Sequence, residues 1–272
     1  PFHPPGEYWY IREGEAPEQR SGRRRAVVFP PRDQRREWDL SDGVLNPSAD
    51  YPGGYELTLV NLIRERLDAW REQGWPGVTR TTLELLQWWR RNGRDKRLFF
   101  AQIEAVETVI FLKEARPDFL QGIAVPVDEP TLQQKENGIR AFARYACKMA
   151  TGAGKTTVMG MIAAWSILNK VNSRGDARFS DVVLIICPNV TIRRRLAELD
   201  PEAGEGSLYR TRDLVPTHLM PLLRQGRVLT MNWHVFEPQG VQTGGVSARV
   251  SRTGVPVRIR ETIIIGPKTT TA

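Results

Sequence analysis

The chain has 272 residues, of which 40% are apolar, and a formal net charge of +8 that is carried mostly by arginine. This length suffices for one large domain or two modest ones, and no apolar run is long enough to span a membrane. The positive charge favours a polyanionic partner such as nucleic acid, although a solvated surface explains it equally well. Because the sequence begins with Pro1 and shows no signal peptide, we expect a piece of a longer polypeptide.

The two cysteines, Cys147 and Cys187, both lie in apolar, strand-like runs. Neither has the neighbours or the spacing of a metal-ligand motif. We therefore expect two buried thiols in a protein of the reducing cytoplasm.

Residues 1–54 are rich in Pro, Gly and Arg. The short apolar islands at Phe2, residues 8–10 and residues 26–29 are expected to dock as edge strands or loops on a larger body, or to be partly disordered. The basic run at residues 20–25 suits phosphate contacts, but a solvated loop is the simpler interpretation.

Three helices are predicted next, over residues 55–74, from about 81 to 93, and from about 99 to 115. Apolar residues recur at three- and four-residue steps in each of them. Thr81 with Glu84 predicts a capping box at the start of the second helix. In that helix Trp88 and Trp89 follow two leucines, so packing is favoured over base stacking.

Residues 119–137 form a predicted connector with two prolines. It contains Asp128 and Glu129, a pair that superficially resembles a magnesium-binding motif. Because Pro130 follows directly and the pair precedes the glycine-rich stretch described below, we interpret it as an exposed turn.

From residue 139 the pattern changes to an alternation of strands and helices, which predicts a parallel α/β sheet. Residues 182–187 read Val-Val-Leu-Ile-Ile-Cys, the continuous apolar content of a strand buried on both faces. The predicted strands are residues 140–149, 182–187 and 227–232, and the predicted helices are residues 156–170, 190–199 and 216–225, with a loop over 200–214.

Residues 238–272 are punctuated by glycine. A strand-like run covers residues 255–265, and a polar end covers residues 268–272. This region is either a hairpin inserted in the domain or a ragged tail.

The stretch that carries most chemistry is residues 149–157, Met-Ala-Thr-Gly-Ala-Gly-Lys-Thr-Thr, between a predicted strand and a predicted helix. That context predicts a phosphate-binding loop. Its glycines let the backbone approach an anion, and the amides at the helix N-terminus face it. Lys155 can reach the β- and γ-phosphates, and the Thr156 hydroxyl can hold Mg²⁺. The candidate nucleotide-binding residues are Thr151, Gly152, Ala153, Gly154, Lys155, Thr156 and Thr157, with Lys155 and Thr156 as the catalytic candidates.

This loop resembles motif I of superfamily 2 helicases and translocases, and most closely that of the motor (Res) subunit of type III restriction enzymes. Residues 98–102 resemble the glutamine element of these motors, residues 186–189 with 193–196 resemble motif Ia, and residues 229–236 resemble motif Ib. The match to motif I is specific by itself. Each of the other three matches is weak alone, but their order along the chain supports the resemblance. Together they cover about half of the chain. One departure is Met149, where motif I usually begins with glycine.

The resemblance implies roles for individual residues. Gln102 would read adenine, since an amide offers both a donor and an acceptor. The motif Ia and Ib residues would hold phosphates of one DNA strand at the carboxyl ends of their strands. For Arg193 a solvent-facing role is an equal alternative, and we expect His234 to be a packed or hydrogen-bonded residue rather than a catalyst. The DNA-binding candidates are Pro188, Asn189, Arg193, Thr230 and Asn232.

Three parts of such a motor are missing from the sequence: the Asp-Glu carboxylate pair of motif II after the loop, the second RecA-like lobe with its arginine finger, and a nuclease motif. An arginine finger alone is worth several orders of magnitude in rate. We therefore expect the chain to bind ATP and Mg²⁺ weakly and to turn ATP over poorly.

These observations predict an α/β fold, with an N-terminal loop-rich and helical region over residues 1–97 and an incomplete RecA-like phosphate-loop lobe over residues 98–272. The predicted function is ATP-dependent movement on duplex DNA in a restriction-modification system, with a methyltransferase or specificity subunit as partner. The alternatives are another phosphate-loop NTPase, although no Asn-Lys-x-Asp motif of a GTPase follows the loop, and a nucleic-acid-binding module without catalysis.

Overall fold

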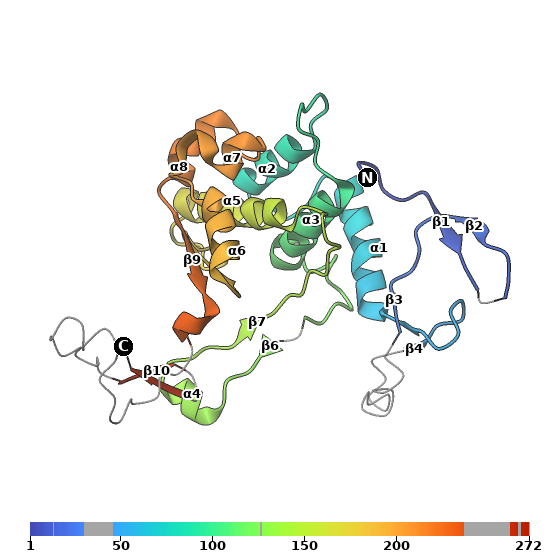
Figure 1. Ribbon diagram of the computed structural model, residues 1–272, viewed down its shortest axis with the longest axis horizontal. Coiled ribbons are helices and arrows are strands. Elements are labelled where there is room, and N and C mark those ends of the chain that lie inside the picture. The colour runs from blue at the N-terminus through green and yellow to red at the C-terminus, as the bar shows by residue number, and fades with distance from the viewer. Residues whose placement is uncertain (13, 30–45, 126, 237–261, 266–267, 272) are drawn as a thin grey trace.

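The fold is mixed α/β, with helices as its largest elements (Figure 1). Its strands form one parallel pair and four small antiparallel sheets. The mixed α/β class is thus confirmed, but the described strands do not assemble into the larger parallel sheet that the alternation of strands and helices predicted. The computed structural model describes residues 1–12, 14–29, 46–125, 127–236, 262–265 and 268–271.

The N-terminal residues form short strands that project from the helical body beside α1 (Figure 1). β1 (Glu7–Tyr10) pairs with β2 (Glu18–Ser21), and β5 (Tyr55–Glu56) lies between β3 (Val27–Val28) and β4 (Asn46–Pro47). All these pairs are antiparallel. Of the apolar islands, residues 8–10 lie in β1 of a separate hairpin, and residues 27–28 form β3, an edge strand of the three-stranded sheet.

The basic run of residues 20–25 is mostly exposed, as expected, but its charges are paired within the chain. Arg23 makes a two-pronged ion pair with Glu104, and the Nε of Arg25 lies 3.1 Å from a carboxylate oxygen of Glu56. This run is therefore bound to the helical body more firmly than a solvated loop would be.

Three helices follow as predicted: α1 (Thr58–Glu72), α2 (Arg80–Arg90) and α3 (Phe100–Glu114). The predicted cap of the second helix is wrong, because Thr79, two residues before Thr81, occupies the N-cap position. Its hydroxyl accepts a hydrogen bond from the amide of Thr82 at 3.0 Å, which satisfies one of the free N–H groups of the first turn.

A buried carboxylate ties these helices together. Glu107 of α3 is fully buried and accepts hydrogen bonds from Arg71 of α1 at 2.8 Å and from Arg90 of α2. A buried charge of this kind is tolerated only when it is paired, so the three helices are fixed in one mutual arrangement.

The two tryptophans of α2 serve packing, as predicted. Trp89 is buried, and its indole N–H donates to the carbonyl of Leu214 at 2.7 Å. Trp88 donates to the carbonyl of Asp213 at 3.1 Å.

The connector and the strand predicted over residues 140–149 differ from expectation. The connector contains β6 (Val127–Asp128) and a short helix, α4 (Leu132–Glu136). Only β7 (Phe142–Ala143) is a strand, and it pairs antiparallel with β6 rather than joining the parallel pair. The predicted strand is wrong because these residues find no parallel neighbour among the described strands.

Asp128 and Glu129 do not form a free acidic pair. Asp128 lies in β6 and makes an ion pair with Arg144, and Glu129 lies 3.3 Å from the Lys135 ammonium group. Each carboxylate therefore has its own cation, and both side chains are accessible to solvent, as expected, but Asp128 lies in a strand rather than in a turn.

The longest helix, α5 (Lys155–Asn172), runs through the helical body and packs against α2 and α3. A buried hydrogen-bond network joins the three. The Trp165 indole donates to Glu114 at 2.6 Å and to Thr82 at 3.1 Å, and the Asn169 amide donates to the same Thr82 hydroxyl at 2.9 Å. Satisfied buried networks fix one packing arrangement, so α5 has a defined position and direction.

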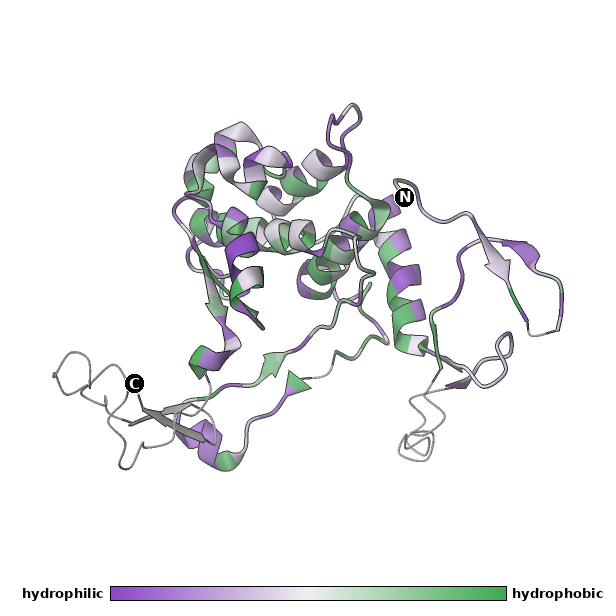
Figure 2. Cartoon of the chain, in the orientation of Figure 1, coloured by the Kyte–Doolittle hydropathy of each residue, from purple (hydrophilic) through white to green (hydrophobic). Residues whose placement is uncertain are grey.

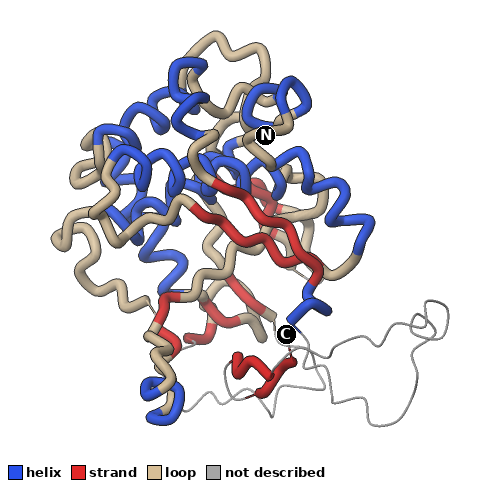
Figure 3. Tube along the Cα trace, turned by 90° about the vertical axis from the view of Figure 1, so that its left-hand side faces the viewer, coloured by secondary structure: helices blue, strands red, loops and turns tan. Residues whose placement is uncertain are grey.

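The parallel pair consists of β8 (Val182–Cys187) and β9 (Arg227–Asn232), which lie side by side in Figure 3. Val183 and Ile185 pack against the core. Val182, Leu184 and Ile186 point the other way and are 46%, 46% and 53% exposed. The prediction of a strand was correct, and the prediction that it is buried on both faces was wrong, since helices cover only one face.

Short helical segments connect β8 to β9 and pack against α2 and α5. Buried residues of the predicted N-terminal region (1–97) and of the predicted lobe (98–272) belong to one core cluster. The short helical segments contribute to that cluster. The segments are α6 (Val190–Arg195), η2 (Leu196–Leu199), η3 (Gly204–Gly206), α7 (Leu208–Thr211), η4 (Thr217–Leu219) and α8 (Met220–Leu223), with η5 (Trp233–Phe236) after β9.

Near the C-terminus β10 (Thr262–Ile265) pairs antiparallel with β11 (Lys268–Thr271). This pairing agrees with the strand-like character of residues 262–265 and with the hairpin alternative. The remainder of the run, residues 255–261, lies outside the described residues.

Candidate functional site

The phosphate loop, residues 151–157, leads directly into α5. Gly152 and Gly154 have φ angles of 80° and 81°, in the left-handed region that side chains disfavour. Gly154 is the N-cap of α5, so the helix begins at Lys155. The loop is open to solvent at Thr151, Gly152 and Lys155, half-buried at Ala153, Gly154 and Thr156, and buried at Thr157. Free amides at the start of a long helix therefore face an accessible surface.

Gln102 lies against this loop, although 52 residues separate it from Gly154 in the sequence. It occupies the third position of α3, where its Oε1 accepts from the Phe99 amide at 2.8 Å. Its Nε2 lies so close to Gly154 that a Cβ placed on that glycine would overlap it. Two stretches that were matched separately in the sequence thus meet at one place.

The Lys155 side chain bends back over the loop. Its Nζ donates to the carbonyls of Met149 at 3.0 Å and Ala150 at 2.9 Å. Both acceptors are neutral, and the lysine is exposed. No carboxylate holds this ammonium group among the described residues, so an anionic ligand would compete only with two carbonyls.

The loop offers the kinds of group that bind a nucleoside triphosphate. A left-handed glycine at the N-cap, an accessible lysine and a hydroxyl at Thr156 provide amides, a cation and a magnesium ligand in consecutive positions. Within the described part of the chain, no group of three or more His, Cys, Asp or Glu residues is placed to hold a metal ion. Mg²⁺ would therefore depend on the nucleotide phosphates and Thr156.

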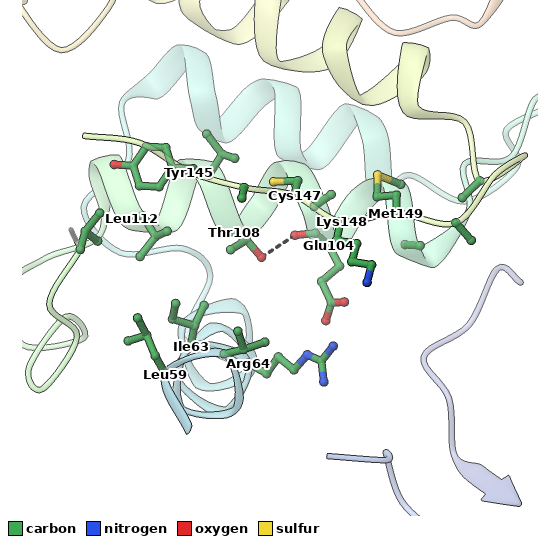
Figure 4. Close-up of a pocket in the computed structure, with 18 of the residues that line it drawn as sticks. Leu59, Ile63, Arg64, Glu104, Thr108, Leu112, Tyr145, Cys147, Lys148 and Met149 are labelled. Atoms are coloured by element: carbon green, nitrogen blue, oxygen red, sulfur yellow. Dashed lines mark hydrogen bonds between the residues drawn. The ribbon is translucent and has the colours of Figure 1, made fainter. Parts of the chain in front are cut away.

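A groove beside the loop was not anticipated from the sequence. It is a cavity of about 500 Å³ between α1, α3 and the extended residues 144–150 (Figure 4). Leu59, Ile63 and Leu112 form its apolar wall, and Arg64 and Glu104 lie at its polar end, as Figure 4 shows. The periodicity of residues 55–74 predicted a helix but not this groove, which the first half of α1 lines.

Cys147 lies in the extended segment and lines the groove (Figure 4). The residue is exposed, which corrects the prediction of a buried thiol, and desolvation of the sulfur raises the pKa of its thiol. Cys187 is buried at the end of β8, as predicted.

The predicted DNA-binding residues lie at the carboxyl ends of β8 and β9. We call this region (residues 187–189 and 230–232) the strand edge, meaning the ends of the two strands and not a lateral edge of the sheet. Cys187 pairs in register with Asn232, and its Sγ lies 3.3 Å from the Asn232 Oδ1. The Asn189 side chain caps α6 by accepting from the Ile192 amide at 2.9 Å. Pro188 and Asn189 are exposed, and Thr230 and Asn232 are half-buried.

Arg193 lies in α6, next to the strand edge, with Arg194 and Arg195. All three side chains are exposed, and none has an ion-pair partner among the residues that the structure describes. His234 follows β9, and its ring lies 4.2 Å from that of Trp233. The ring contact agrees with the packed role predicted for His234, although the residue is exposed.

Gly226, just before β9, lies against Ile167 in the second half of α5, so the start of β9 is beside the end of that helix.

Comparisons with protein-family models, with curated proteins and with solved structures found no match. Among the described helices, none combines the length and the apolar character needed to cross a membrane.

Proposed function

We propose that this chain is the nucleotide-binding part of an ATP-dependent motor that moves on duplex DNA, of the kind represented by the Res subunit of type III restriction enzymes. The contact between Gln102 and Gly154 is the observation that supports this most, since it brings the glutamine that resembles the adenine-reading residue of these motors to the glycine-rich loop. In this proposal the described elements are the core of an incomplete RecA-like lobe in a cytoplasmic protein.

The residues would act as follows. The amides of residues 152–155 hold the phosphates, Lys155 contacts the β- and γ-phosphates, and Thr156 ligates Mg²⁺. Gln102 keeps its Nε2 amide group beside the loop, with N–H donors for the base. ATP supplies the free energy for movement, and this chain positions it. The sequence lacks a carboxylate pair to activate water, so we expect ATP binding with little turnover.

The strand edge and α6 would contact the DNA backbone. Asn189, Thr230 and Asn232 present short polar side chains there, and Arg193 adds positive charge. Such groups position a strand and carry no base code. Sequence recognition would therefore come from a separate methyltransferase or specificity subunit.

Calorimetry with ATP and Mg²⁺ tests the proposal. We expect Lys155→Ala to weaken ATP binding at least tenfold, equivalent to about 1.4 kcal/mol. Lys113→Ala is the matched control, because Lys113 is an exposed lysine on α3 away from the loop. Equal binding by both variants would contradict the assignment of the phosphate loop, and ATP turnover at the rate of a complete motor would contradict the expected lack of turnover.

A further inference from the structure

A second basic site lies in the loop between α2 and α3, which rises at the top of Figure 1. Residues 90–97 contain five cationic side chains and one carboxylate. Their net charge of +4 is half of that of the whole chain, concentrated in eight residues. Concentrated charge of one sign attracts a ligand of the other sign.

These residues surround a cavity of about 440 Å³. Its lining includes Arg90, Arg91, Arg94 and Arg97 with His3, and it contains no carboxylate. A concave surface lined by cations raises the local potential more than the same charges on a flat surface would.

Two of the arginines hold the loop in place. Arg94 is buried and donates to the carbonyls of Arg212 and Asp213, both at 2.9 Å, while Arg91 makes an ion pair with Asp213. Burial, and then the neighbouring charge of Arg91, lower the pKa of Arg94. Keeping the charged guanidinium group of Arg94 out of water costs free energy. An anion bound beside it would reduce that cost.

Arg97 is the accessible cation of the cavity. Its guanidinium group lies over the Phe2 ring, 4.3 Å from the ring centroid, and its Nη2 lies 3.4 Å from the Nε2 of His3. Of the carboxylates that the structure describes, none is within ion-pair distance of Arg97. The ring contact fixes the plane of a guanidinium whose donors remain available, the geometry that suits a phosphate.

We propose that the cavity formed by residues 90–97 with Phe2 and His3 binds a backbone phosphate of nucleic acid through Arg97. Apart from Leu98, the residues that line the cavity lie outside the four motif-like stretches, and binding there does not require ATP. Arginine supplies the planar fork for phosphate, and the partly exposed Phe2 ring offers an apolar face to a sugar or base. No acidic or amide side chain other than Asn92 lines the cavity, so binding should not depend on sequence.

The test is binding of a fluorescent 20-base-pair duplex to the whole chain, without nucleotide, across a series of salt concentrations. We expect Arg97→Gln to weaken binding roughly three- to tenfold at low salt and to reduce the slope of log K against log salt by about one. Arg97→Lys should retain most of the affinity. Thermal melts of each variant confirm that it is folded.

Arg174→Gln is the control, since Arg174 is exposed beyond the far end of α5 and the substitution removes the same charge. Equal effects of Arg97→Gln and Arg174→Gln would overturn the proposal. Loss of ATP binding with unchanged duplex binding would assign the site to a nucleotide phosphate and would also overturn it. Because Lys155→Ala tests the phosphate loop separately, failure of one proposal is distinguishable from failure of the other.

Discussion

Helix α5 and strand β8 follow one another in the chain, yet α5 is enclosed by other elements, whereas none of the described residues covers the outer face of β8. Met161, Ile167 and Leu168 of α5 are fully buried. In β8 every second side chain from Val182 to Ile186 is about half exposed. Figure 2 shows hydrophobic residues along both elements, so hydrophobicity alone does not explain the contrast.

The difference follows from the number of neighbours that each element has. α5 packs against α2, α3, α7 and α8, whereas β8 has helices on one face and one strand partner. Strands of parallel sheets are usually covered on both faces. The phosphate loop thus leads into a helix that is packed by several others. The strand edge is held by the backbone hydrogen bonds between β8 and β9.

The largest expected effect measures this contrast directly. Ile167→Ala should lower the free energy of unfolding by about 2–5 kcal/mol, because it leaves a cavity between α5 and the start of β9. Ile186→Ala, on the bare face, should cost at most about 1 kcal/mol. Urea unfolding of both variants gives the comparison. Equal costs would mean that the outer face of β8 is covered in solution.

A second variant asks how closely the loop fits the helical body. Gly154→Ala should cost about 2 kcal/mol, from the left-handed φ angle and from the overlap with Gln102. In a Gln102→Ala background the same change should cost only about 1 kcal/mol, since the overlap is gone. The control is Gly175→Ala, where a Cβ meets nothing within 4 Å. Additive costs would show that Gln102 and Gly154 are not in contact.

The smallest effect concerns the two thiols, and it needs no substitution. We expect iodoacetamide at pH 8 to label Cys147 and to leave Cys187 unmodified in the folded protein. Because desolvation raises the pKa of Cys147, less thiolate is present at pH 8 than in a free peptide thiol. Its labelling should therefore be slower than that of the peptide and should accelerate as the pH rises. Mass spectrometry of tryptic peptides gives both rates. Rapid labelling of Cys187 would mean that β8 and β9 separate in the native state.

The sequence by itself determined the elements that depend on local pattern. The apolar repeat of residues 55–74 and the glycine, lysine and threonine spacing of residues 151–157 predicted α1 and the turn into α5 correctly. These features arise from side chains a few residues apart, so periodicity and backbone preference suffice to identify them. The approach of Gln102 to the loop could be expected only through the resemblance to known motors.

Only the tertiary structure decided which faces are covered. Residues 140–149 and β8 both have the composition of buried strands. Whether a strand is buried depends on which other elements pack beside it, and its own composition does not determine that. The same reason explains why Cys147 is exposed, why half of the apolar stripe of α1 lines a groove, and why Thr79 rather than Thr81 caps α2. It also explains the basic cavity of residues 90–97: its charges are visible in the sequence, but packing of Arg91 and Arg94 against residues 212–213 shapes them into one site.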